Sequence, residues 1–106
     1  MGTPEVLAQL RAFVNARDWS QFHTPENLAK SISIEAAELL EAYQWGSQAE
    51  LEQVKEELAD VLTYAYLLAD KLGLDPETII SEKLKITETK YPVDKARGSS
   101  TKYDQL

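Results

Sequence analysis

The chain has 106 residues, of which 43% are hydrophobic and 27% charged, enough for one domain with a modest core. Its net charge of −7 argues against binding to a nucleic acid polymer, which requires a broad basic face. The sequence shows no membrane span and no signal peptide, and it lacks cysteine, so we expect a cytoplasmic protein without a membrane partner.

Residues that start and stop helices divide the chain into four predicted helices. The starts are two Thr-Pro-Glu motifs, one Ser-x-x-Glu capping box and one Asp-Pro-Glu motif, at residues 3–5, 24–26, 47–50 and 75–77. The helices are expected to end near Ala16, near Tyr43, near Leu72 and before Pro92. No segment alternates as a strand does. We predict one all-α domain over residues 1–106, a four-helix bundle with a long central hairpin and a polar tail at 91–106.

Two carboxylate pairs form the most informative motif. Glu35-Ala-Ala-Glu38 and Glu57-Leu-Ala-Asp60 each place two acids three residues apart, on one face of a helix. No Lys or Arg stands three or four residues from any of them, so their repulsion is not relieved. Glu35 also takes a core position in the apolar stripe of its helix, where an unpaired carboxylate is costly. The four acids therefore predict a cation site inside the hairpin; the alternative is that Glu35 lies at the edge of the stripe and reaches water.

The predicted ligands are all hard oxygen donors, which favour Mg²⁺, Mn²⁺ or Ca²⁺ over zinc or copper. Mg²⁺ is often held by carboxylates together with substrate phosphates. The charge distribution agrees, because residues 31–60 hold eight acids and one base, whereas residues 83–102 hold six bases and two acids. Lys83 and Arg97, in the basic segment, are candidates to neutralise phosphate oxygens.

Aromatic side chains surround the predicted hairpin. Trp19 and His23 precede the second helix, Trp45 follows it, and Tyr64 lies one turn beyond Asp60. Such rings can stack on a nucleobase. The alternative is that each tryptophan closes one end of a small bundle.

Several motifs together resemble one known family. They are Trp19-Ser-Gln-Phe-His23, Glu35-Ala-Ala-Glu38, Gln44-Trp45, Glu57-Leu-Ala-Asp60, Tyr91-Pro92 and Arg97-Gly-Ser-Ser. The chain is similar, over about residues 17–103, to the MazG-like all-α nucleoside triphosphate pyrophosphohydrolases, and within them to the dCTP pyrophosphatase branch.

The resemblance implies Mg²⁺-dependent hydrolysis, with Mn²⁺ as a possible substitute, of a (deoxy)nucleoside triphosphate to monophosphate and pyrophosphate. It implies that Glu35, Glu38, Glu57 and Asp60 are the catalytic and metal-binding residues, that Trp19, Trp45 and Tyr64 line the nucleoside pocket, and that Lys83 contacts phosphate. His23 and Arg97 complete the set of expected substrate-binding residues. A pyrimidine nucleotide such as dCTP is expected as the substrate of this house-cleaning enzyme. Two positions depart from the family pattern, Thr87 in place of Asn and Leu10 in place of His, and both bear on base preference.

The acidic hairpin and the apolar surface of the third helix allow two further expectations. A non-catalytic, metal-stabilised helical module that docks a basic partner is the alternative function. Leu62, Tyr66 and Ala69 form a second apolar set on the third helix, and exposed apolar surface of this kind usually marks an interface. Together with the resemblance, this predicts a homo-oligomer, a tetramer rather than a dimer.

Overall fold

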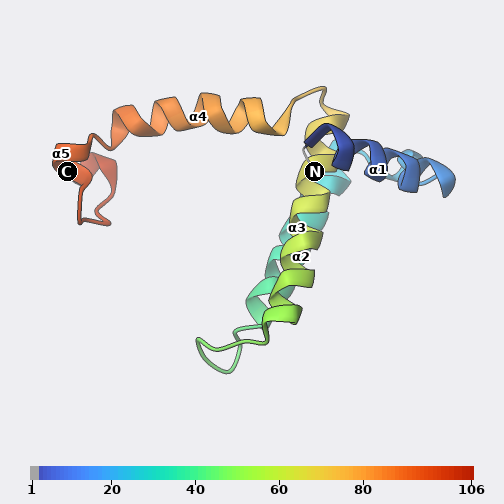
Figure 1. Cartoon of the computed structure of the whole chain (residues 1–106), viewed down its shortest axis with the longest axis horizontal. Coiled ribbons are helices and arrows are strands. Elements are labelled where there is room, and N and C mark those ends of the chain that lie inside the picture. Colours follow the sequence, from blue (N-terminus) through green and yellow to red (C-terminus); the bar gives the residue numbers. More distant parts are fainter. Residues whose placement is uncertain (1–2) are drawn as a thin grey trace. The chain divides into compact units, whose positions relative to one another are not determined.

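The computed structural model describes residues 3–106, and every regular element among them is helical (Figure 1). The elements are α1 (Thr3–Ala16), η1 (Ser20–Phe22), α2 (Pro25–Glu41), α3 (Leu51–Lys71), α4 (Pro76–Lys90), α5 (Val93–Ala96) and η2 (Tyr103–Gln105). The predicted all-α class is therefore confirmed. The short helices α5 and η2 lie in the segment that the sequence analysis expected to be a polar tail.

Two helix starts follow the expected capping chemistry. Thr24 precedes α2 in an extended conformation, and its hydroxyl accepts a hydrogen bond of 3.1 Å from the backbone N–H of Asn27. Asp75 caps α4 in the same way, accepting from the N–H and the hydroxyl of Thr78 at 2.9 and 2.8 Å. Each satisfies an N–H group that the first turn of a helix leaves without a partner. The predicted cap at Thr3 lies at the edge of the described residues, and its side chain falls outside them.

The predicted capping box at Ser47 is wrong. The third helix begins at Leu51 instead, after an extended Glu50 whose side chain makes no capping hydrogen bond. The reason lies in the preceding turn. Beyond the end of α2, Tyr43 and Gln44 continue with tight backbone hydrogen bonds of 3.0 Å to residues three earlier in the chain, and the chain reverses only after Gly46, at a φ of 138°. Residues 47–50 are therefore needed to close the loop. The helix is shorter than expected, 21 residues or about 32 Å.

Replacing Thr24 by Ala is expected to lower the free energy of unfolding by about 1 kcal/mol, because the first turn of α2 loses its cap. Ser47→Ala is the matched control and should leave stability unchanged, since Ser47 lies in the loop before α3. Urea unfolding followed by circular dichroism measures both. Equal losses in the two variants would contradict the assignment of the caps.

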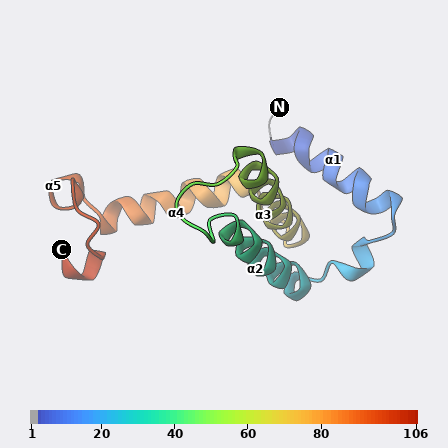
Figure 2. The same cartoon turned by 90° about the horizontal axis from the view of Figure 1, so that it is seen from below.

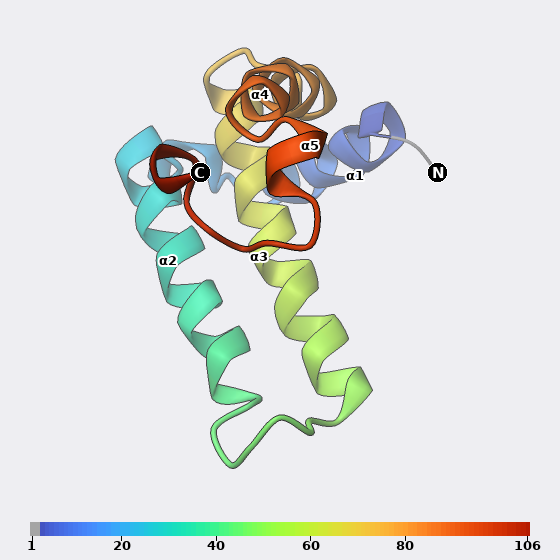
Figure 3. The same cartoon turned by 90° about the vertical axis from the view of Figure 1, so that its left-hand side faces the viewer.

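The helical hairpin of α2 and α3 is the centre of the first of two compact units, which ends at Leu74. Figure 3 shows the two helices side by side, joined by the loop at residues 42–50. The buried apolar side chains of the unit are Leu7 and Val14 of α1, Leu28 of α2 and Ala69 of α3. Within one chain this is a small core, and several leucines of α3 stay exposed.

Besides the set of Leu62, Tyr66 and Ala69, α3 carries an apolar stripe with a spacing of three and four residues, and this stripe is only partly covered. Its members Leu51, Leu58 and Leu72 are 75%, 44% and 52% exposed. Ala69, which the sequence analysis assigned to the second apolar set, is buried, while Leu62 of the same set is half exposed. One chain therefore covers neither set completely.

The second compact unit runs from Asp75 to Leu106 and contains α4, α5 and η2. An aromatic contact folds its tail: the rings of Tyr91 and Tyr103 meet edge to face at 6.0 Å, and the Tyr91 hydroxyl accepts a hydrogen bond from the N–H of Tyr103. The Lys90 ammonium lies 4.6 Å from the centre of the Tyr103 ring. The tail is thus tied to the end of α4. None of the helices among residues 3–106 is both long and apolar enough to cross a membrane.

Candidate metal centre

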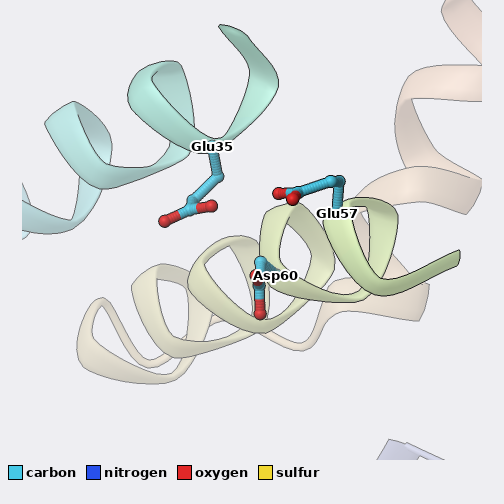
Figure 4. Close-up of side chains that lie close together, drawn as sticks. All are labelled: Glu35, Glu57 and Asp60. Carbon is cyan, nitrogen blue, oxygen red and sulfur yellow. The ribbon is translucent and has the colours of Figure 1, made fainter. Parts of the chain in front are cut away.

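Three of the four predicted carboxylates converge between α2 and α3. Glu35 extends from α2, and Glu57 and Asp60 extend from adjacent turns of α3 (Figure 4). One oxygen from each lies within 4.8 Å of the other two. The i,i+3 spacing places both acids of α3 on one face, and the antiparallel hairpin brings that face to Glu35. We call Glu35, Glu57 and Asp60 the carboxylate cluster.

The surroundings of the cluster favour binding of a cation. Glu35 and Glu57 are half-buried, and the Oε2 atom of each is buried without a hydrogen-bond partner. A buried carboxylate oxygen without a partner is costly unless it is paired or coordinates a metal. The ion pairs of Arg11 with Asp70, of Lys30 with Glu26 and of Lys55 with Glu52 do not involve the cluster. The donor set therefore fits a hard divalent cation.

Burial and mutual repulsion both act on these acids. Loss of solvation raises the pKa of Glu35, and the neighbouring Glu38, Asp60 and Glu57 raise it further. Burial likewise raises the pKa of Glu57, with added contributions from Glu38 and Asp60. Glu38 is exposed and lies outside the three-oxygen cluster, yet it is close enough to act on both buried acids. Its role as a fourth ligand stays a prediction.

These shifts predict that the metal-free protein becomes more stable on mild acidification. A carboxyl group whose pKa is higher in the folded state binds its proton more tightly there, so its contribution is present below the unfolded pKa and is lost as pH rises through the folded pKa. Asp70 acts oppositely, because Arg11 lowers its pKa, but its effect falls at still lower pH. Lowering pH from neutrality toward the ordinary glutamate range should therefore raise the melting temperature in EDTA.

The double variant Glu35→Gln/Glu57→Gln is the control for this pH effect. It lacks both raised groups, so its melting temperature should rise less over the same range. An identical rise in the two proteins would assign the effect to other groups.

Trp19 and His23 lie in the segment that joins α1 to α2, visible in Figure 2. The Trp19 ring packs edge to face on Phe13 of α1, with centroids 5.6 Å apart, and is 43% exposed. His23 is half-buried and lines a cavity of about 80 Å³ where this segment meets α1, α2 and α3. Both residues are thus held in place, with Trp19 still accessible to a ligand.

Trp45 is 92% exposed and lies beyond the other end of α2. The 17 residues of that helix separate it from Trp19 and His23 by about 25 Å. A single chain therefore does not bring the two tryptophans together. Tyr64, one turn beyond Asp60 on α3, is half-buried. Lys83 and Arg97 belong to the second compact unit, where both are exposed.

Sequence patterns did not indicate the polar residues that join α1 and the segment after it, which carries Trp19 and His23, to α3. Arg11 of α1 makes a two-pronged ion pair with Asp70, 59 residues away, with Nε 3.0 Å from Oδ2. Lys71 reaches the backbone oxygen and the hydroxyl of Ser20. These pairs are distant in sequence and follow no helical period, so no local pattern indicates them.

Comparison with known proteins shows which family the chain belongs to. The model of the MazG-like family matches residues 30–106, nearly three-quarters of the chain. The chain belongs to the MazG-like family. The matched range contains all four predicted carboxylates together with Trp45, Tyr64, Lys83 and Arg97, whereas Trp19 and His23 precede it.

Individual relatives match nearly the whole chain. Proteins named dCTP pyrophosphatase 1 from Mus musculus and Homo sapiens are 40% and 37% identical, over 98% of this chain and 68% of their own length. The crystal structure of a pyrophosphatase from Archaeoglobus fulgidus is 43% identical, with a TM-score of 0.77 over 84% of this chain and 91% of that one. The MazG-like helical fold and its resemblance to pyrophosphatases are thus supported by both sequence and structure.

Proposed function

We propose that this protein is a nucleoside triphosphate pyrophosphohydrolase that uses Mg²⁺ to release pyrophosphate and a nucleoside monophosphate. The observation that carries the proposal is the carboxylate cluster, with two buried oxygens that lack a hydrogen-bond partner. The relatives named dCTP pyrophosphatase 1 supply the reaction class. A hydrolase that removes surplus or damaged nucleotides acts on free triphosphates, in agreement with an acidic chain that has no broad basic face.

Each carboxylate has a role in this proposal. Glu35, Glu57 and Asp60 hold the ion, and Glu38 is the proposed fourth ligand. Held by these carboxylates, such an ion would polarise the phosphate oxygens and lower the pKa of an attacking water. Because Glu38 is exposed beside Glu35 and Glu57, it is also our candidate to accept the proton of that water. Lys83 and Arg97 are proposed to neutralise the departing pyrophosphate.

The proposed substrate is a pyrimidine deoxynucleotide, dCTP or a close analogue. The names of the mammalian relatives support this choice, and Trp19, His23, Trp45 and Tyr64 supply the surfaces on which a base could rest. Leu10 lines an apolar groove with Leu62, Thr63 and Tyr66. Because a leucine side chain has no hydrogen-bond donor, this position cannot donate to a base.

Trp45→Ala should raise the KM for the preferred nucleotide more than it lowers kcat. Stacking on the base is expected to be equally strong in the ground and transition states, and its loss weakens binding by about 1–3 kcal/mol for each base. Steady-state kinetics over a range of nucleotide concentrations measure both constants. Tyr43→Ala, a change to an exposed ring in the preceding turn, is the control. A lower kcat with an unchanged KM would contradict stacking by Trp45.

We propose that one MazG-like domain over residues 1–106 assembles as a homotetramer made of two tight dimers. The exposed leucines of α3 support this, because contiguous apolar surface usually marks an interface. The separation of Trp19 from Trp45 supports it as well, since a second copy can bring one tryptophan to the other. Light scattering at micromolar concentration should give a mass near four times 11.9 kDa, and a mass near 11.9 kDa would contradict the assembly.

The proposed activity is tested with a panel of ribo- and deoxyribonucleoside triphosphates, assayed with Mg²⁺ and separated by ion exchange. The expected early products are a nucleoside monophosphate and pyrophosphate, with dCTP or a related pyrimidine nucleotide hydrolysed fastest. Early orthophosphate together with a diphosphate would show cleavage of the wrong bond. Mg²⁺ binding without turnover of any nucleotide would instead support a non-catalytic helical module.

A further inference from the structure

A polar latch joins the segment that carries Trp19 and His23 to the end of α3. The latch consists of Arg11, Ser20, Asp70 and Lys71. We propose that it positions this segment for the base of the nucleotide, so that Arg11, Asp70 and Lys71 are positioning residues for substrate affinity. The inference rests on the proposed function, because it assigns a role in holding the substrate of the same site.

The contacts of the latch are specific. The guanidinium of Arg11 donates through Nε and Nη2 to both carboxylate oxygens of Asp70, a geometry that fixes direction as well as distance. The hydrogen bonds from Arg11 lower the pKa of Asp70, so the carboxylate keeps its charge to lower pH than a free aspartate does. The next residue, Lys71, donates to the carbonyl oxygen and hydroxyl of Ser20 at 3.4 and 3.3 Å. Two consecutive residues of α3 thus hold α1 and η1.

The segment is already rigid on its α1 side. Asp18 adopts a left-handed conformation with a φ of 53°, and the N–H of Trp19 donates back to the carbonyl of Val14, as in the turns that end many helices. The Trp19 ring packs edge to face against Phe13, and the Arg17 guanidinium lies 3.8 Å from the centre of the Phe13 ring and 6.0 Å from that of Trp19. These contacts fix the segment to α1, and the latch joins both to α3.

The latch and the carboxylate cluster share one face of α3. Asp60, Tyr64, Leu67 and Lys71 follow each other in steps of four, three and four residues, which keeps them on one side of the helix. The cavity at the far end of this face is lined by Leu67 and Lys71 together with His23 and Leu28. A nucleotide with its phosphates at Asp60 and its sugar and base near Tyr64 would point toward the latched segment.

The experiment compares Lys71→Met with wild-type protein and with Lys71→Arg, which keeps a donor for Ser20. Lys30→Met is the matched control, because Lys30 is an exposed lysine paired only to Glu26 on its own helix. Steady-state kinetics with Mg²⁺ and the preferred triphosphate give KM and kcat. Acrylamide quenching of Trp19 fluorescence, in a Trp45→Phe background, reports the position of the segment without any turnover.

Lys71→Met should raise KM roughly tenfold, the scale of one lost charge-assisted hydrogen bond, with kcat within about twofold of wild type. Trp19 should become more accessible to acrylamide, Lys71→Arg should restore both readouts, and Asp70→Asn should act in the same direction as Lys71→Met. Wild-type turnover with an unchanged KM in Lys71→Met, whatever its melting temperature, would overturn the latch alone. A wild-type protein without turnover on any nucleotide would overturn the proposed function, and the substrate role of the latch with it.

Discussion

Glu57→Gln is expected to abolish turnover while raising the melting temperature of the metal-free protein. The amide keeps the volume of the side chain but loses the charge that binds a cation. Loss of a second-sphere partner typically reduces metal affinity or activity by about 10–100-fold, so loss of a direct ligand should reduce the rate by at least roughly 100-fold. The stability gain follows from the raised pKa of Glu57, which reflects poor solvation and the repulsion of Glu38 and Asp60.

The matched control is Glu56→Gln, which removes the same charge one residue earlier on α3. Glu56 is exposed and lies outside the cluster, so turnover should change little. Circular dichroism verifies that helicity is kept, and thermal unfolding in EDTA gives the stability. Near-normal activity of Glu57→Gln would contradict the proposed metal site. A fall in the melting temperature of the metal-free variant would contradict the electrostatic account of the cluster.

Chelation of divalent ions is expected to have the second large effect. EDTA should stop turnover completely, and added Mg²⁺ should restore it. An ion that binds only the folded state stabilises it by about 2.7 kcal/mol at a concentration one hundred times Kd. For a domain of this size each kcal/mol corresponds to roughly 4–8 °C in Tm, so the shift is easily resolved.

The double variant Glu35→Gln/Glu57→Gln separates specific binding from general screening by salt. Mg²⁺ should raise the Tm of wild-type protein strongly and that of the double variant little. Titrations with Ca²⁺ and Mn²⁺ then rank the ions by the Tm shift that each causes in wild-type protein but not in the double variant. Equal shifts in both proteins would place the ion elsewhere on the acidic surface.

Local sequence patterns predicted the parts of the fold that depend on residues close together in the chain. The Thr24 and Asp75 caps, and the helices that follow them, need only one turn of sequence to specify them. The pairing of Glu57 with Asp60 is equally local, because helix geometry alone brings them to one face. Placing Glu35 opposite them required only one further assumption, an antiparallel hairpin, which the structure has.

Features that depend on contacts between distant parts of the chain could not be predicted from local sequence patterns. The Ser47 motif has the residues of a capping box, but the turn after Gly46 uses those residues to close the loop. The ion pair between Arg11 and Asp70 joins positions 59 residues apart, and nothing in either neighbourhood marks it. The apolar pattern of α3 indicated two faces to be buried but not which neighbour covers each, and a single chain leaves Leu51 and Leu62 exposed.

The helix α3 is continuous from Leu51 to Lys71, so the distances between residues along its axis are fixed. Asp60 and Lys71 are eleven residues apart, so the helical rise fixes their separation along the axis at about 16 Å. Backbone hydrogen bonds on every turn prevent that length from stretching. If the phosphates bind at Asp60 and the base at the segment around Trp19, as we propose, that segment has to take up any difference in ligand length, because the spacing along the helix cannot adjust.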